Sequence, residues 1–375
     1  MSNLYRSAIS ARAAKLPNLP HIPAPTPSPE KRHDADLPGS GLGPPPIPKP
    51  KRTPNPAFSP ISASGYFEEA LQVSLPTRNL DCRVYYSAPK TKGNDPRVGT
   101  VMVCHHGAGY SGLSFACFAK EVSEMTRGEC GALAFDARRH GETTSTGEEE
   151  DGDLSIDVLV ADFCAMIETV FPDPNSSPSL LLIGHSMGGS VVVRSCPKLI
   201  EKKYRIAGVA VLDVVEGSAV EALPHMNSLL NARPEGFDSM EEAIEWHVNT
   251  NTIQNSSSAR LSIPSAIQHV PEASLPYQWR TPLRSTAPYW LSWFQGLSSS
   301  FLAARTARLL VLAGTDRLDK ELMIGQMQGK FQQTVVSGVG HMLHEDDPTQ
   351  IAEIMVRFWR RNERVVVGVK KVGEL

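Results

Sequence analysis

Short apolar runs, separated by stretches of helical periodicity, dominate the chain from about residue 100 onward. A short and continuously apolar run is typical of a parallel strand that is buried on both faces of its sheet. Apolar positions that recur near every 3.6 residues are typical of an amphipathic helix. The pattern predicts strands at 100–105, 131–136, 180–183, 206–212, 308–312 and 334–337, and helices at 113–125, 154–171 and 349–361.

Strands that alternate with helices indicate the α/β class, with a mostly parallel, doubly wound sheet and right-handed crossovers. Two earlier stretches, 67–73 and 82–87, alternate between apolar and polar residues instead. They are predicted to be half-exposed strands joined by a turn near Pro76.

The first 60 residues do not follow this pattern. Half of the chain's 30 prolines lie between Pro17 and Pro60. Such a segment cannot bury a core and favours extended conformations. We predict a disordered proline-rich tail at 1–60, either a solvated leader or a ligand for an SH3-like or WW-like module, followed by one domain at 61–365.

The pattern also breaks between about residues 214 and 304. This stretch holds four of the five tryptophans, short helical pieces and many prolines. An insertion of this size between consecutive strands usually covers the carboxyl ends of the sheet. The sequence therefore predicts a helical cap at about 214–304.

Composition excludes several classes of protein. A formal net charge of -3 argues against a nucleic-acid or membrane-surface protein. No apolar stretch reaches the length of about 18 residues that a transmembrane helix needs. The six cysteines form no C-x-x-C pair, and several lie in apolar runs. They indicate reduced core cysteines, and hence a cytoplasmic or nuclear location.

The stretch 180–189, Leu-Leu-Leu-Ile-Gly-His-Ser-Met-Gly-Gly, combines an apolar strand with Gly-x-Ser-x-Gly and a helix start. This is the strand, turn and helix of a nucleophile elbow. Ser186 is therefore the predicted nucleophile. Gly184 and Gly188 are expected to keep side chains out of the crowded space beside it.

A serine nucleophile needs a histidine base and an acid that orients the base. In α/β-hydrolases these three follow in the order serine, acid, histidine. His341 stands after the last predicted strand, and His344 near it is expected to be solvated. The residues alone leave the acid open. Asp316, or Asp319 just beyond it, occupies the usual position, and Asp213 also ends a strand.

The oxyanion intermediate needs two N–H donors. Met187 follows the nucleophile, and the loop His106-Gly107-Ala108-Gly109 follows an early strand, so Met187 and Ala108 are the predicted donors. His140 either lines the site or supports the structure. None of these steps calls for a metal ion or an organic cofactor.

Longer phrases resemble those of the protein phosphatase methylesterases, a family in the α/β-hydrolase superfamily. The similar phrases are VAVLDVVEGSA at 209–219, YQWR at 277–280, YWLSWFQGL at 289–297, LAGTDRLDK at 312–320 and IGQMQGKF at 324–331. Cap phrases are more specific than an elbow, since caps differ between hydrolase families. The resemblance covers roughly residues 60–360, and the proline-rich leader suits a eukaryotic, fungal-type member.

The resemblance implies an esterase that removes the methyl group from the C-terminal leucine of the catalytic subunit of type 2A protein phosphatase. It also implies that Asp213, rather than Asp316, completes the triad with Ser186 and His341. The chain departs from the family at Ala108, where a glycine is usual; alanine keeps the N–H but loses freedom at positive φ.

Two other functions remain as alternatives. One is a general α/β-hydrolase that acts on a small-molecule ester or a lipid, which a large apolar pocket would favour. The other is a non-catalytic partner that binds the phosphatase and holds it inactive.

Overall fold

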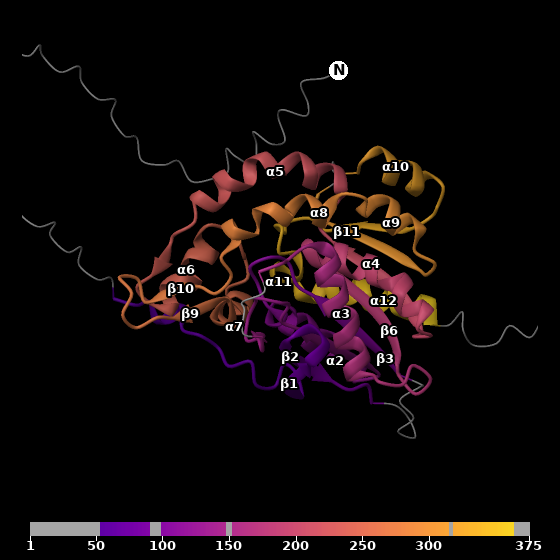
Figure 1. Ribbon diagram of the computed structural model, residues 1–375, viewed down its shortest axis with the longest axis horizontal. Coiled ribbons are helices and arrows are strands. Elements are labelled where there is room, and N and C mark those ends of the chain that lie inside the picture. Colours follow the sequence, from indigo (N-terminus) through magenta and orange to yellow (C-terminus); the bar gives the residue numbers. More distant parts are fainter. Residues whose placement is uncertain (1–52, 91–98, 148–151, 315–317, 364–375) are drawn as a thin grey trace, which may run out of the picture. The chain divides into compact units, whose positions relative to one another are not determined.

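A mostly parallel sheet runs through the computed structural model, which describes residues 53–90, 99–147, 152–314 and 318–363 (Figure 1). Most of the predicted tail and the alternative acid Asp316 lie outside these described residues. The strands of the sheet are β1 (Glu69–Leu75), β2 (Leu80–Ser87), β3 (Thr100–His105), β4 (Cys130–Phe135), β5 (Thr144–Ser145), β6 (Ser179–His185), β7 (Ile206–Leu212), β11 (Arg308–Leu312) and β12 (Gln332–Val335).

The strands lie in the order β1-β2-β4-β3-β6-β7-β11-β12, with the short β5 beside β2. Neighbours from β4 to β12 are parallel, whereas β1, β2 and β4 pair antiparallel. The predicted α/β class and mostly parallel sheet are confirmed. Since the strands from β3 to β12 run in one direction, the loops at their carboxyl ends share one edge of the sheet.

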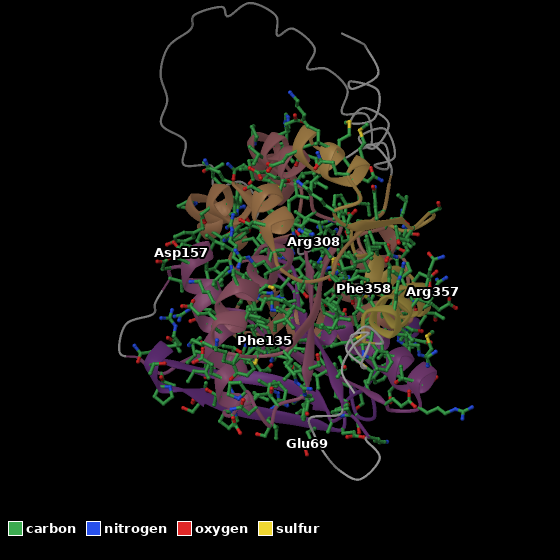
Figure 2. The ribbon with its side chains drawn as sticks, turned by 90° about the vertical axis from the view of Figure 1, so that its right-hand side faces the viewer. Glu69, Phe135, Asp157, Arg308, Arg357 and Phe358 are labelled. Atoms are coloured by element: carbon green, nitrogen blue, oxygen red, sulfur yellow. The ribbon has the colours of Figure 1, made fainter. Side chains whose placement is uncertain are left out.

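Helices cover both faces of this sheet. On one face lie α3 (Ile156–Val170) and α4 (Met187–Glu201), and on the other lie α2 (Ala116–Thr126) and α12 (Pro348–Glu363). Successive residues of β3 point to opposite faces, so Val101 and Val103 join the first apolar cluster and Met102 joins the second. Figure 2 shows Phe135 and Phe358 within the packed interior, while Glu69 and Arg357 point outward. Burial of both faces explains the continuously apolar strands.

The segment between β7 and β11 contains both helices and a small sheet. Its helices are α5 (Glu216–Asn231), α6 (Met240–Asn249), α7 (Ser256–Ala266), α8 (Trp290–Phe294) and α9 (Leu297–Ala303). The strands β8 (Gly236–Phe237), β10 (Tyr277–Trp279) and β9 (Ile267–His269) form an antiparallel sheet in that order. The predicted helical insertion thus also contains a small sheet, which the sequence did not indicate because strands this short give no clear period-two pattern.

The cap region has its own apolar cluster and is also fixed to the main core. Phe237, Ile244 and Ile263 belong to the separate cluster. Trp290 and Trp293 instead pack in the core that contains α3 and α4, and the indole N–H of Trp293 donates to the Leu154 carbonyl at 2.7 Å. The 3-10 helix η5 (Leu283–Tyr289) precedes α8, and the α-helices α10 (Lys320–Met327) and α11 (Leu343–Asp346) follow β11 and β12.

The compact unit begins at Pro54, several residues before the predicted boundary at 60/61. Phe58 packs against the cap cluster, and the Arg260 side chain donates to the Ser59 carbonyl at 2.7 Å. The Ile61 N–H donates back to the Arg260 carbonyl at 3.0 Å. Pro56 fits the first turn of a short 3-10 helix, so a proline in this segment does not prevent the segment from packing on the fold.

The cysteines and the helices bear on two further expectations from the sequence. All six cysteines are free, and all except Cys117 are buried. Among the described residues, none of the helices combines the length and the apolar character needed to cross a bilayer.

A pair of truncations tests the new boundary. Removing residues 1–52 is expected to leave the melting temperature unchanged, because the proline-rich segment cannot contribute a core. Removing residues 1–60 also deletes Phe58 and its neighbours, and should lower the melting temperature by about 2–4 °C, or roughly 1 kcal/mol for a large domain. Thermal melts of both chains give the comparison. Equal melting temperatures for the two truncations would contradict the placement of 54–60 in the fold.

Candidate active site

Ser186 stands between β6 and α4 with a strained backbone, at φ 52° and ψ −119°. A Cβ on Gly184 would lie 2.2 Å from the Gly188 carbonyl oxygen, and one on Gly188 would lie 2.3 Å from the His105 carbonyl oxygen. Both positions therefore exclude any side chain. The predicted role of the two glycines in the sharp turn is confirmed, and the Ser186 side chain is left partly exposed at the sheet edge.

Asp213 and His341 are brought together from the ends of β7 and β12. The His341 Nδ1 donates to the Asp213 Oδ2 at 2.8 Å, and the other oxygen, Oδ1, accepts the Ala313 N–H at 2.9 Å. The Asp213 side chain is fully buried, whereas that of His341 is 49 % exposed. Because Nδ1 faces a carboxylate, the proton lies on Nδ1 and the Nε2 atom is free to accept one.

Ser186 and the His341 imidazole share this edge because β6 and β12 belong to one parallel set, with β7 and β11 between them. The Ser186 N–H donates to the Leu212 carbonyl at 3.0 Å, immediately before Asp213. Among the described residues, no hydrogen bond joins the Ser186 hydroxyl to His341. In free hydrolases such bonds are often long and shorten only when substrate is bound.

The predicted oxyanion loop follows β3 and lies directly against the elbow. A Cβ on Gly107 would lie 3.3 Å from the Ser186 Cβ. The positive φ of the loop falls on Gly109, at 82°, while Ala108 has none. Alanine in place of the family's glycine is therefore free of backbone strain, and its N–H remains a possible donor.

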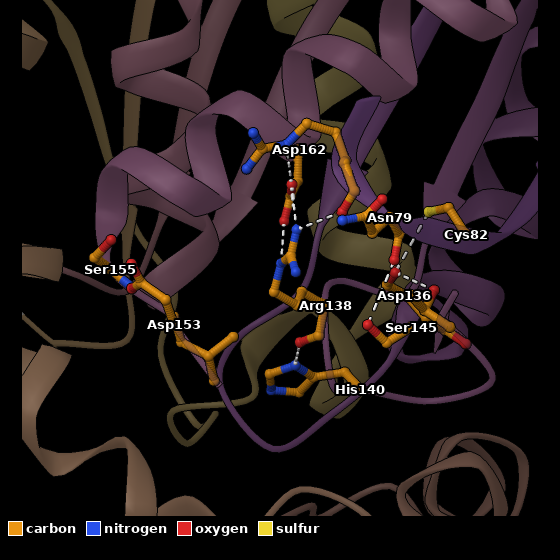
Figure 3. Close-up of polar contacts among 12 residues, drawn as sticks. Asn79, Cys82, Asp136, Arg138, His140, Ser145, Asp153, Ser155 and Asp162 are labelled. Atoms are coloured by element: carbon orange, nitrogen blue, oxygen red, sulfur yellow. Dashed lines mark hydrogen bonds and ion pairs between the residues drawn. The ribbon is translucent and has the colours of Figure 1, made fainter. Parts of the chain in front are cut away.

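A polar network supports this loop from the segment after β4 (Figure 3). The Gly109 N–H donates to the His140 Nε2 at 2.9 Å, and the His140 Nδ1 donates to the Arg138 carbonyl at 2.8 Å. The buried Arg138 guanidinium in turn forms an ion pair with Asp162 of α3 at 2.7 Å. His140 thus supports the loop, which is one of the two roles that the sequence left open. The Arg138–Asp162 pair has no sequence signal.

The expectation that His344 is solvated was wrong. His344 is completely buried, and its ring stacks on Phe115 with a centroid distance of 4.3 Å. The acidic residues after it suggested a surface turn, but α11 turns inward under the site. Glu345 beside it is also buried.

The alternative acids can be described only in part. Asp316 lies outside the described residues. Asp319 caps α10 by accepting the Leu322 N–H at 2.9 Å, and it also accepts the Ser298 hydroxyl. Asp319 therefore has the ordinary helix-capping role of an aspartate.

A cleft of about 430 Å³ lies elsewhere, between the segment after β4 and the cap. Arg138, Arg139, Glu142, Gln268 and Arg280 contribute to its lining. None of the three residues that meet at the sheet edge lines it. Its charged walls differ from those of an acyl-chain pocket.

Comparisons with known proteins agree with this fold. A model of the alpha/beta hydrolase family matches residues 102–354. Two solved structures share the fold: E-2-(acetamidomethylene)succinate hydrolase has a TM-score of 0.58 at 17% identity, over 77% of this chain and 98% of its own. The peroxisomal alpha-beta-hydrolase Lpx1 of Saccharomyces cerevisiae has a TM-score of 0.57 at 16% identity, over 79% of this chain and 85% of its own. The chain belongs to the alpha/beta hydrolase family.

Sequence relatives narrow the family further. Protein phosphatase methylesterase 1 of Cryptococcus neoformans is 45% identical, over 100% of this chain and 96% of the relative. The Emericella nidulans protein of the same name is 41% identical, over 100% of this chain and 93% of the relative. Within the alpha/beta hydrolases, the chain thus belongs to the protein phosphatase methylesterase family, and the predicted resemblance is confirmed. Fold and relatives together make it a serine ester hydrolase.

Six histidines of the described chain are buried, and burial lowers the pKa of each. The pKa falls to about 4 for His105 and His140, and to about 3 for His185 and His247. The pKa values of His106 and His344 lie well below the usual range of a histidine.

These histidines predict acid sensitivity. An unfolded histidine binds a proton near pH 6.5, whereas each folded one stays neutral, so the free energy of unfolding falls as the pH drops below about 6.5. Each can contribute up to about 1.4 kcal/mol per pH unit. Burial raises the pKa of Asp136 to about 6 and also raises the pKa values of Glu345 and Asp346. These three carboxyl groups oppose the fall in stability that the six histidines cause. Denaturant titrations at pH 7.5, 6.5 and 5.5 should therefore show decreasing stability. A stability that is constant or rises toward pH 5.5 would show that the histidines are not buried in the neutral form.

Proposed function

We propose that the protein removes the methyl group from the C-terminal leucine methyl ester of the catalytic subunit of type 2A protein phosphatase. The hydrogen bond between Asp213 and His341, at the same sheet edge as Ser186, carries the proposal for the chemistry. The names of the relatives, which cover nearly the full chain, support the substrate. The products are methanol and a free carboxylate.

In the first half of the proposed reaction, the Ser186 hydroxyl attacks the ester carbonyl and its proton passes to the His341 Nε2. The buried Asp213 carboxylate stabilises the imidazolium that forms. The N–H groups of Met187 and Ala108 are the proposed donors to the oxyanion, and each such donor typically contributes about 10²–10³ in turnover. His341 then gives the proton to the departing methoxide, which leaves as methanol.

In the second half, water attacks the acyl-enzyme by the same route and releases the peptide carboxylate. The positive φ of Ser186 suits this chemistry, because it places the hydroxyl at the exposed edge of an otherwise buried strand. Every proton that moves is held by a residue of this chain, so the proposed route uses neither a metal ion nor an organic cofactor.

The cap and the location complete the proposal. We assign residues 214–304 as the cap that faces the substrate protein, since its ends join the main core directly beside Asp213 and β11. The phosphatase catalytic subunit is the proposed partner, with its C-terminal tail as substrate. Six free cysteines, five of them buried, support a location in the cytoplasm or the nucleus.

The alternative of a general lipid or small-molecule esterase has less support. The described cleft is lined by arginines and does not include the three proposed catalytic residues. The acyl group of a peptide ester, unlike a long acyl chain, requires no extended apolar pocket.

The decisive experiment incubates the protein with carboxymethylated phosphatase catalytic subunit and follows the release of labelled methanol. Ser186→Ala should abolish release, because no other group can form the acyl-enzyme. Ser190→Ala is the matched control: Ser190 lies one turn along α4, is fully buried, and its hydroxyl has no partner among the described residues. Methanol release that survives in Ser186→Ala would disprove the proposal.

The same variants separate chemistry from binding. Ser186→Ala should still bind the catalytic subunit in a pull-down, since only the hydroxyl is lost. A wild-type protein that binds and inhibits the phosphatase without releasing methanol would support the non-catalytic alternative instead.

The choice of acid predicts a ranking of two variants. Asp213→Asn should lower turnover by about 10⁴ while the protein stays folded, because the amide favours the wrong histidine tautomer. Asp316→Asn should be much milder. Asp319→Asn serves as a control for capping: it should lower the melting temperature slightly and leave turnover intact. Turnover and melting temperature are measured for all three. A larger loss in Asp316→Asn than in Asp213→Asn would assign the acid to the end of β11.

A further inference from the structure

His185, the residue directly before the proposed nucleophile, connects two other parts of the site. It is the last residue of β6 and is 1 % exposed. Its Nε2 lies 2.8 Å from the main-chain carbonyl oxygen of His341, and the two imidazole rings are 4.6 Å apart between centroids. A residue that the motif leaves unspecified thus contacts the loop that carries the base.

The hydrogen bond fixes the tautomer of His185. A carbonyl oxygen only accepts, so the proton lies on Nε2 and the Nδ1 atom carries none. Among the described residues, Nδ1 has no hydrogen-bond partner. Burial lowers the pKa of His185 to about 3, so the ring is neutral at physiological pH.

The bare Nδ1 edge of the same ring faces the oxyanion loop. A Cβ on Gly107 would lie 2.7 Å from Nδ1, so the ring packs directly against the Gly107 backbone. One imidazole therefore lies between the loop that carries His341 and the loop that carries Ala108. The buried ring of His344 packs beside it, with centroids 4.6 Å apart.

The loop of His341 needs such support. The ring of His341 is half exposed, and Gly338 and Gly340 precede it in a turn after β12. The Asp346 side chain accepts the Gly340 N–H at 2.6 Å, and His185 donates to the carbonyl of the following residue, His341. These two bonds fix the main chain, while the bond to Asp213 fixes the ring.

We infer that His185 is a positioning residue for the esterase reaction: through its Nε2–H it holds the His341 backbone at the distance from Ser186 and the oxyanion loop that proton transfer requires. The inference rests on the proposed function, since it assigns His341 as base and acid. His185 itself touches no reacting atom. Its effect is therefore expected in turnover rather than in substrate affinity.

The expected size follows from geometry. A displacement of about 1 Å in a catalytic group can cost about 10² in rate. His185→Leu keeps an apolar side chain of moderate size but removes the donor, and should lower kcat by about 10–100-fold with little change in KM. His185→Gln places an amide N–H close to the Nε2 position, and should recover most of that loss.

His247 offers a matched control in the cap. It is also completely buried, its Nδ1 donates to a main-chain carbonyl, that of Ala243, at 2.7 Å, and its Nε2 has no partner among the described residues. Burial lowers the pKa of His247 to about 3, as for His185. His247→Leu should lower the melting temperature about as much as His185→Leu, yet leave kcat near the wild-type value.

The experiment compares two esters of one N-acylated, leucine-terminated peptide, a methyl ester and a nitrophenyl ester. Methoxide needs a proton from His341 to leave, whereas nitrophenolate does not. The kcat for the methyl ester should therefore fall further in His185→Leu than the kcat for the nitrophenyl ester, and His185→Gln should restore the ratio. Melting temperatures of all variants are measured in parallel.

The outcomes are distinct. A wild-type enzyme that cleaves neither ester through Ser186 would overturn the proposed function itself. If the wild type cleaves both but His185→Leu behaves like His247→Leu, or loses both activities equally, His185 is structural and the inference is wrong. If His185→Leu does not fold, the inference is decided by His185→Gln: wild-type-like turnover on both esters supports it, and a loss on both overturns it.

Discussion

The buried carboxylate of Asp213 is the group on which the rest of the site depends. A charge removed from water must be hydrogen-bonded, or the fold loses several kcal/mol. Here the two oxygens accept from a main-chain N–H of the β11 end and from the imidazole of His341. The carboxylate thereby links β7, β11 and the loop after β12, and it sets the orientation of the half-exposed His341 ring.

The order of the strands makes that link possible. β7 lies between β6 and β11 in the sheet. Asp213, at the end of β7, therefore lies between the elbow after β6 and the end of β11. The main-chain bond from Ser186 to Leu212 holds the proposed nucleophile and the proposed acid at the ends of adjacent strands. Only the histidine reaches the site through a loop, which is why its main chain has supports of its own.

Histidine is used repeatedly in this fold as a neutral, buried connector. His140 holds the oxyanion loop through Gly109, and His185 contacts both the oxyanion loop and the base loop. A neutral ring has one donor and one acceptor nitrogen, which a carboxylate or an ammonium cannot offer without burying a charge. His140 bonds main-chain atoms through both nitrogens, and His185 does so through its donor. The same property makes the site sensitive to acid, because a protonated ring loses its acceptor.

Local sequence determined the strand and helix pattern, the elbow at Ser186 and the position of His341, since apolar runs, glycines and chain order are all local signals. It left the acid open among Asp213, Asp316 and Asp319, because each follows a predicted strand and strand order is not encoded locally. It also placed His344 in solvent, judging from its acidic neighbours. Only the tertiary structure showed which aspartate meets the imidazole, that α11 turns inward, and that His140 and His185 bond to distant main-chain atoms. Those contacts join residues far apart in the chain, and their partners are backbone groups that every residue carries, so no sequence pattern distinguishes them.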